Sequence, residues 1–226
     1  MTKQATRLCA EAARLNDALP QTQCTRCGYP DCAAYAQAIA DGQAAINQCP
    51  PGGEEGVARL AALTGQPVLP LNPAHGPQAP RTLAVIDEAW CIGCTLCLKV
   101  CPTDAILGSN KRMHTVIEAY CTGCELCIPV CPVDCITLDN ASGSRTGWAA
   151  WSAPQAELAR TRYQFHRLRL ERDAQANATR LEHKAEHKLA DLAAHSLHTD
   201  PVVLDKKRQV IEAALARARA KRSGQA

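Results

Sequence analysis

Eight cysteines in the middle of the chain form two runs with one internal spacing. The runs are Cys91, Cys94, Cys97 and Cys101, followed by Pro102, and Cys121, Cys124, Cys127 and Cys131, followed by Pro132. Each run reads C-x2-C-x2-C-x3-C-P, and thiolates at this spacing hold four-iron, four-sulfur cubanes. The sequence therefore predicts iron–sulfur clusters, whose chemistry is the uptake and release of single electrons.

The fourth cysteine of each run lies too far along the chain to serve the cluster of the first three. In two-cluster bacterial ferredoxins this cysteine binds the other cluster. The same pattern here predicts cluster A on Cys91, Cys94, Cys97 and Cys131. It predicts cluster B on Cys121, Cys124, Cys127 and Cys101.

The repetition extends beyond the cysteines. Gly93 matches Gly123, and Ile106 matches Ile136, at the same offset. Such a repeat predicts two similar half-domains, about residues 81–110 and 111–141, in one ferredoxin-like domain. Short strands are expected at 82–86 and 114–117, with a short helix after each Cys-Pro pair. The loop glycines are expected to let backbone amides approach the cluster sulfurs.

A third set of cysteines lies upstream, at Cys24, Cys27, Cys32 and Cys49. Three of them come from one loop, and a helix at 33–39, with Asp31 as its N-cap, would carry the chain to the fourth. The spacing alone allows an iron–sulfur cluster or a zinc ion. Zinc fits the tandem runs poorly, because four-cysteine zinc sites usually come as two separated C-x2-C pairs.

Both cysteine blocks resemble one known family. The stretch from Leu19-Pro20-Gln21-Thr22-Gln23-Cys24 to Cys49-Pro50-Pro51-Gly52-Gly53 is similar to the amino-terminal cluster domain of the B subunit of the Rnf/Rsx electron transport complex. The tandem unit at 81–141 is similar to the second domain of the same family. The resemblance implies a third cluster, C, on Cys24, Cys27, Cys32 and Cys49, which makes three [4Fe-4S] clusters in all. It also implies redox protein partners, among them the other subunits of a membrane complex that couples electron transfer to ion movement.

The chain departs from that family at both ends. Members of the family commonly begin with a hydrophobic membrane segment, whereas this sequence has no run of about 18 apolar residues. We therefore expect no transmembrane segment, and a cytoplasmic protein that associates peripherally with the inner membrane. About 85 residues follow the tandem unit and match no motif.

These features predict an α+β chain with four parts. They are a small helical cluster domain at 1–66, a proline-rich linker at 67–80, the tandem domain at 81–141 and a helical basic extension at 142–226. Helices are expected at 3–18, 54–64, 154–198 and from 201 to about 221. The extension forms either a solvated hairpin or a partly disordered tail.

Two cysteines and three histidines fall outside the predicted quartets. Cys9 and Cys135 are interpreted as small packed residues, and no secretory signal supports disulfides. His166, His183 and His187 lack a surrounding ligand constellation, which argues against a metal site. Residues 151–226 hold 15 Lys and Arg against 9 Asp and Glu. Nucleic-acid binding is not expected, because acidic residues are interleaved and aromatic residues are few.

Three functions compete at this stage. The first is electron transfer within an Rnf/Rsx-type complex, in which this chain supplies clusters and has no catalytic site of its own. The second is a free-standing ferredoxin-like carrier that feeds another reductase. The third is a protein whose metals only support its fold. No flavin, nicotinamide or phosphate-binding motif is found.

Overall fold

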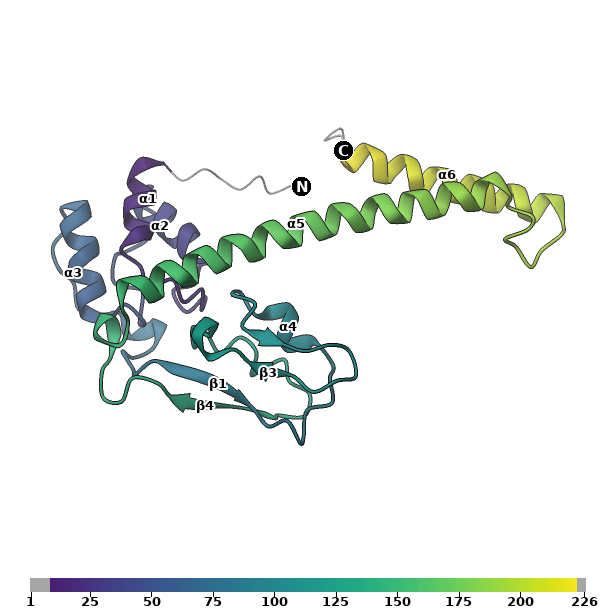
Figure 1. The fold of residues 1–226 in the computed structure, drawn as a ribbon. Coiled ribbons are helices and arrows are strands. Elements are labelled where there is room, and N and C mark those ends of the chain that lie inside the picture. Colours follow the sequence, from purple (N-terminus) through teal and green to yellow (C-terminus); the bar gives the residue numbers. More distant parts are fainter. Residues whose placement is uncertain (1–8, 223–226) are drawn as a thin grey trace. The chain divides into compact units, whose positions relative to one another are not determined.

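The computed structural model describes residues 9–222 of the 226-residue chain. It is a mixture of helices and short strands, as predicted (Figure 1). The described residues divide into two compact units between Arg167 and Leu168. All the cysteines lie in the first unit, so its architecture decides where the predicted ligands meet. The predicted domain boundaries remain predictions.

Three helices build the upstream part of the first unit: α1 (Ala10–Asp17), α2 (Cys32–Ala40) and α3 (Gly53–Thr64). They enclose a core centred on Leu15, Tyr35, Ile39, Ile46 and Leu60. The Asp31 side chain caps α2 by accepting from the Ala34 amide at 2.7 Å, as predicted. Gly65, with φ of 70°, ends α3, also as predicted. Residues 3–8 of the first predicted helix lie outside the described residues.

The tandem region repeats in its backbone as it does in its sequence. Strand β1 (Thr82–Ile86) pairs antiparallel with β4 (Ile136–Asn140), and β2 (Ile106–Leu107) pairs with β3 (Thr115–Val116) (Figure 1). Ile86 faces Ile136 in the first ribbon, and their repeat equivalents Val116 and Ile106 face each other in the second. Each strand of the first half therefore pairs with a strand of the second half. This is the arrangement expected for two repeats related by an internal twofold axis.

The short helix of the first half lies before the Cys-Pro pair, and the prediction that it follows was wrong. Helix α4 (Leu96–Val100) occupies the interval between the third and fourth cysteines of its run. After Pro102 the chain turns through Asp104, with φ of 49°, and enters β2 directly. The interval is too short for a helix there. The second half has turns at 126–130 in place of α4.

The loop glycines are required by close backbone packing. A Cβ atom on Gly93 would lie 2.5 Å from the backbone of Arg112, and one on Gly123 would lie 2.3 Å from the Thr82 carbonyl oxygen. Both glycines have positive φ, of 67° and 66°. Each glycine thus lets one cysteine loop pack against the chain that enters a strand. This close approach differs from the predicted one, which was between amides and cluster sulfurs.

The proline-rich segment is held to the structure along its length. It contains a 3-10 turn, η1 (Pro73–His75). The Asn72 amide donates to the Asn47 carbonyl at 2.9 Å, and His75 Nδ1 lies 3.0 Å from the Arg26 carbonyl. The Gln78 side chain accepts from the Glu54 amide and donates to Thr146. This segment is therefore an ordered part of the first unit, hydrogen bonded to residues on both sides of it in the sequence.

Helix α5 (Ala153–Ala190) begins in the first unit and contacts both of its cysteine-bearing parts. Two 3-10 turns precede it in the sequence: η2 (Glu118–Tyr120) lies in the tandem region, and η3 (Gly147–Ala150) lies just before α5. Arg160 pairs with Asp17 of α1, and the Tyr163 hydroxyl donates to Asp31 at 2.9 Å. On the tandem side, Arg162 donates to the Thr103 carbonyl at 2.7 Å. The first turns of the predicted extension thus belong to the cluster-bearing unit.

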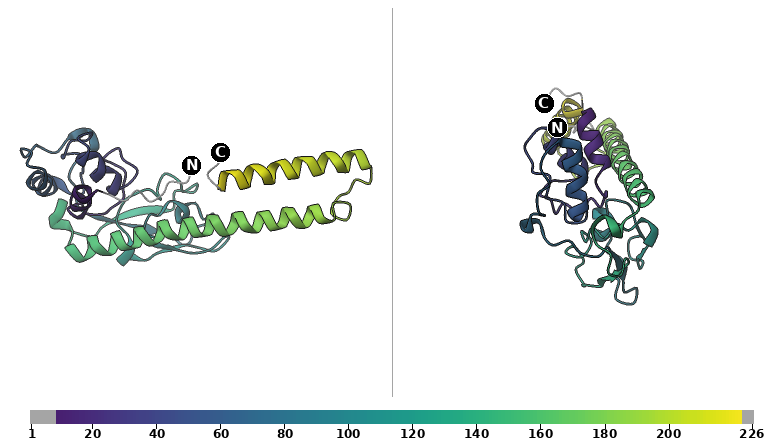
Figure 2. Two further views of the ribbon diagram at one scale, coloured as in Figure 1. Left: turned by 90° about the horizontal axis from the view of Figure 1, so that it is seen from above. Right: turned by 90° about the vertical axis from the view of Figure 1, so that its left-hand side faces the viewer.

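The second unit is a helical hairpin, one of the two predicted forms of the extension. Its helices are α5 from Leu168 onward and α6 (Pro201–Arg222), which runs back along it (Figure 2). Arg219 contacts both Glu182 and Glu186, which relieves the repulsion between these neighbours on one helix face. The helix predicted at 154–198 is shorter in the structure, where α5 ends at Ala190. Within residues 9–222 no helix combines the length and apolar character needed to cross a membrane.

Asp31 tests whether α5 is held to the upstream helices as described. Asp31→Ala removes both the α2 cap and the acceptor of Tyr163 and Arg167. Loss of a cap costs about 1 kcal/mol, so the Ala34 amide should exchange with deuterium roughly fivefold faster. Amides of α5 around Tyr163 should also exchange faster. Asp31→Asn keeps a capping oxygen and should restore protection of α2 only. Unchanged exchange in α5 in the alanine variant would contradict this account.

Candidate iron–sulfur centres

Five cysteines line a cavity in the first half of the tandem region. Four of them are the predicted cluster A set, and the fifth is Cys135. The rest of the wall is mostly apolar, with Ile86, Ile92, Val133 and Ile136 among the lining residues. Of the cluster A set, Cys131 comes from the second run and the other three from the first. The chain therefore brings together the four side chains that the predicted assignment groups. An apolar wall of this kind keeps water from the sulfurs.

One histidine makes two contacts with this set. The backbone amide of His114 donates to Cys91 Sγ at 3.3 Å, and its Nδ1 lies 3.4 Å from Cys97 Sγ. The side chain is buried at 1% exposure, and Nε2 has no hydrogen-bond partner. A thiolate accepts hydrogen bonds only, so Nδ1 carries the proton when Cys97 is a ligand. Sequence reasoning missed His114, although it begins the predicted second strand.

A second cavity lies in the other half, and its four cysteines are the predicted cluster B set. Cys101 comes from the first run, and Cys121, Cys124 and Cys127 come from the second. The Ala84 amide lies 3.5 Å from Cys121 Sγ, and the Ala105 amide donates to Cys101 Sγ at 3.2 Å. Ala84 is the repeat equivalent of His114. The two cavities share a backbone plan and differ by an imidazole at this position.

The third cavity lies in the upstream part and is lined by Cys24, Cys27, Cys32 and Cys49. Tyr35 is buried beside it, donates to the Ala45 carbonyl at 2.8 Å and accepts from the Gln48 amide. The Gln23 side chain accepts from the Cys32 amide at 2.9 Å. Gln21 and Gln23 are both buried and have positive φ. Hydrogen bonds of their side chains hold the backbone before Cys24 in this conformation. The run Gln-Thr-Gln was the sequence signal for them.

The upstream cavity and the cluster B cavity belong to loops that touch. The Thr122 hydroxyl donates to the Thr22 carbonyl at 2.9 Å, and each threonine lines its own cavity. Arg26 pairs with Glu125 at 2.6 Å beside this contact. Sequence analysis expected the linker to separate these parts. The contact spans 100 positions, and no local pattern encodes it.

Burial makes several of these thiols less acidic. It raises the pKa of Cys97 to about 11 and the pKa of Cys124 and of Cys127 to about 12. Burial also raises the pKa of Cys32 and Cys49. A free thiol in such a place keeps its proton at neutral pH. Bound iron would replace those protons and stabilise the buried thiolates.

The two remaining cysteines have different surroundings. Cys9 is exposed and caps α1 through its sulfur, so the prediction that it packs as a small apolar residue was wrong. The cap position explains the difference, because the sulfur accepts from the Ala12 amide at the helix end instead of packing in the core. Cys135 is buried, and its Sγ lies 3.5 Å from Cys131 Sγ. The pKa of Cys135 is raised to about 12, mainly by burial and to a smaller extent by the neighbouring Cys131.

Two of the three histidines singled out in the sequence, His166 and His183, lie beside carboxylates. His166 Nδ1 lies 2.8 Å from the Asp104 carboxylate, and His183 lies 3.5 Å from Glu186. In the part of the chain that the structure describes, no three His, Cys, Asp or Glu side chains are placed to hold a single metal ion. The cysteine quartets instead surround cavities.

Two family models match the cysteine-bearing parts of the chain. The model described as "4Fe-4S dicluster domain" matches residues 84–138, and the one described as "Putative Fe-S cluster" matches residues 19–51. These matches support iron–sulfur domains in both places. No solved structure gives a significant match.

Several relatives are named as the B subunit of an ion-translocating oxidoreductase complex. The protein from Azoarcus sp. (strain BH72) is 61% identical over 104 residues, which are 46% of this chain and 57% of the relative. The protein from Thiobacillus denitrificans is 58% identical over 106 residues, 47% of this chain and 56% of the relative. The match therefore spans little more than half the length of these two relatives.

The relative from Hahella chejuensis, which has the same name, gives a longer match. It is 54% identical over 142 residues, which are 63% of this chain and 71% of the relative. Identity at this level over most of the relative agrees with the resemblance of both cysteine blocks. The chain belongs to the family of B subunits of ion-translocating oxidoreductase complexes, the Rnf/Rsx B family.

Proposed function

We propose that this protein transfers electrons through three [4Fe-4S] clusters, held by the twelve cysteines in the three quartets described above. The observation that carries this proposal is the grouping of these cysteines around three separate cavities, one predicted quartet at each, with Cys135 as a fifth cysteine at the cluster A cavity. The clusters, when bound, supply the chemistry, which is the gain and loss of one electron each. The protein holds them, walls them from water and donates hydrogen bonds to their thiolates.

The residues around the cavities have separate tasks in this proposal. Apolar side chains such as Ile86 and Ile136 exclude water at cluster A. Backbone amides of His114 and Ala105 donate to ligand sulfurs in the two tandem sites. Such donors stabilise the added negative charge of a reduced cluster and so tune its potential.

The contacts support a linear order of sites. Clusters A and B share the tandem domain, because each borrows one cysteine from the run of the other. The loop that would hold cluster C touches the loop that would hold cluster B at the Thr22–Thr122 hydrogen bond. The cluster B site would therefore lie between the other two in the chain of contacts. The names of the relatives support other subunits of an ion-translocating oxidoreductase complex as partners. A location on the cytoplasmic face of the inner membrane is part of the same proposal.

Iron and acid-labile sulfide tell this function from a structural zinc protein. Protein purified without oxygen should contain about 12 iron and 12 sulfide per chain, with visible absorbance that dithionite bleaches. Cys124→Ser should remove the spin-resonance signal of one tandem cluster and leave cluster C, whose ligands all lie upstream. A preparation that holds zinc and no labile sulfide would contradict the proposal.

Cys135 tests the ligand assignment at cluster A. It lies beside Cys131, yet its place in the repeat is that of Ala105, which is no ligand. Cys135→Ala should therefore keep the full iron content and the spin-resonance spectrum of cluster A. Cys131→Ala, the matched variant four residues earlier, should lose that cluster. Loss of iron in Cys135→Ala alone would show that the assignment is wrong.

Iron retention should depend on pH in a direction that the thiol pKa values set. Burial raises the pKa of Cys124 and Cys127 to about 12, so a thiolate that loses iron takes up a proton at any lower pH. Protons thus favour the iron-free state, and retention falls as the pH falls. In excess ferrous chelator without oxygen, the bound fraction should be smaller at about pH 6 than at about pH 8.5. Equal retention at both values would contradict this reasoning.

A further inference from the structure

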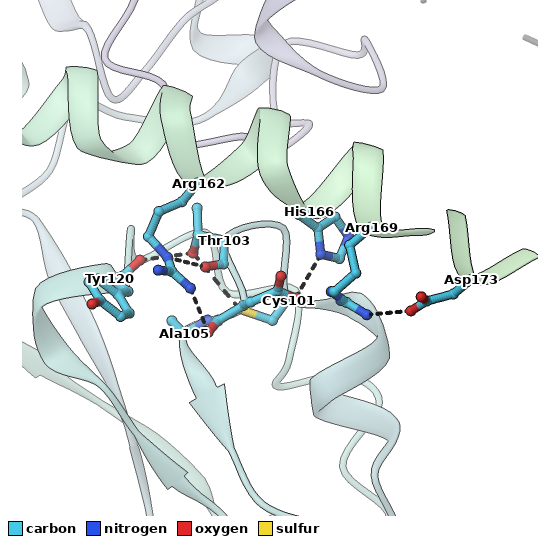
Figure 3. A network of polar contacts seen from close by, with 9 residues as sticks. Cys101, Thr103, Ala105, Tyr120, Arg162, His166, Arg169 and Asp173 are labelled. Carbon is cyan, nitrogen blue, oxygen red and sulfur yellow. Dashed lines mark hydrogen bonds and ion pairs between the residues drawn. The ribbon is translucent and has the colours of Figure 1, made fainter. Parts of the chain in front are cut away.

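One peptide group beside cluster B is hydrogen bonded at both ends. Its N–H, on Ala105, donates to Cys101 Sγ at 3.2 Å. Its carbonyl, on Asp104, accepts from the guanidinium of Arg162 at 3.3 Å. Figure 3 shows Arg162 reaching down from α5 to this loop. A positive charge is therefore linked to a cluster ligand through a single peptide.

Further contacts fix the position of that guanidinium. Arg162 Nε donates to the Thr103 carbonyl at 2.7 Å, and the guanidinium carbon lies 3.6 Å from the centre of the Tyr120 ring. The Thr103 hydroxyl donates to the Tyr120 carbonyl at 2.8 Å, which joins the two loops (Figure 3). Tyr120 precedes Cys121 in the sequence. Arg162 thus contacts both loops that carry ligands to cluster B.

The electrostatic consequence follows from the direction of these bonds. A cation at the carbonyl polarises the peptide group and so strengthens the hydrogen bond from its N–H to the sulfur. The charge itself also favours the reduced cluster, which carries one more negative charge, in surroundings where screening by water is reduced. Both effects make it easier to reduce the cluster.

The repeat supplies an internal comparison. The equivalent peptide near cluster A joins Asp134 to Cys135. Asp104 and Asp134 have matching φ values of 49° and 50°. Within residues 9–222, no arginine side chain is found on the Asp134 carbonyl. The cation on the peptide is therefore a feature of cluster B that the repeat itself does not require.

We infer that Arg162 is a positioning residue that raises the reduction potential of cluster B through the Asp104–Ala105 peptide. This inference rests on the proposed function, because it needs a redox-active cluster on Cys101, Cys121, Cys124 and Cys127. It gives the first turns of α5 a part in electron transfer. The reaction concerned is the one-electron reduction of cluster B by an external reductant, with no bond made or broken.

The test is a redox titration of the holoprotein with dithionite and mediators, followed by spin resonance. The signal of cluster B is identified as the one that Cys124→Ser removes. Arg162→Gln should lower the ratio of reduced to oxidised cluster B about tenfold at a fixed potential, a shift of about 59 mV to more negative values. Arg162→Lys keeps the charge and should restore more than half of that shift. The signals of clusters A and C should not move.

Arg160→Gln is the matched control, because it removes an arginine two positions earlier on α5 that pairs with Asp17. It should leave cluster B unchanged. If Arg162→Gln loses iron, Arg162→Met replaces it, since its apolar side chain is similar in length to the stem of arginine. The potential of cluster B should become more negative in this variant as well. The inference is overturned if a neutral variant with full iron keeps the wild-type potential, or if all three clusters shift together. A wild-type protein without reducible clusters would instead overturn the proposed function.

Discussion

Burial of thiolates is the constraint on which the rest of this structure depends. Burial raises the pKa of at least one thiol at each cavity, among them Cys32, Cys97 and Cys124. These thiols keep their protons at neutral pH unless a cation is bound beside them. The first unit contains three cavities of this kind.

The exchange of Cys101 and Cys131 between the two runs makes the tandem halves depend on each other. Neither half completes a quartet alone, and the two strand ribbons pair the beginning of one half with the end of the other. The Thr22–Thr122 contact and the first turns of α5 then join the upstream cavity to this pair. The proposed electron transfer over three sites would need such fixed spacing, since the rate of each transfer depends on the distance between clusters.

Local and repeated features were predictable from the sequence. The cysteine spacings anticipated which side chains gather at each cavity, because backbone reach limits the choices. The Asp31 cap and the end of α3 at Gly65 followed from short-range hydrogen bonding and φ preference. The His114 contact and the docking of Arg162 were not predictable, because they join positions far apart through tertiary packing. Cys9 was misjudged because a capping position looks like a helix interior in a mixed sequence.

The most direct measurement is the anomalous scattering of iron in crystals grown without oxygen. The account predicts three compact groups of four iron atoms. Each group should lie within bonding distance, about 2.3 Å, of one quartet of sulfurs, with Cys101 on the site of Cys121, Cys124 and Cys127. Single metal peaks, or a site in which Cys101 joins Cys91, Cys94 and Cys97, would contradict it.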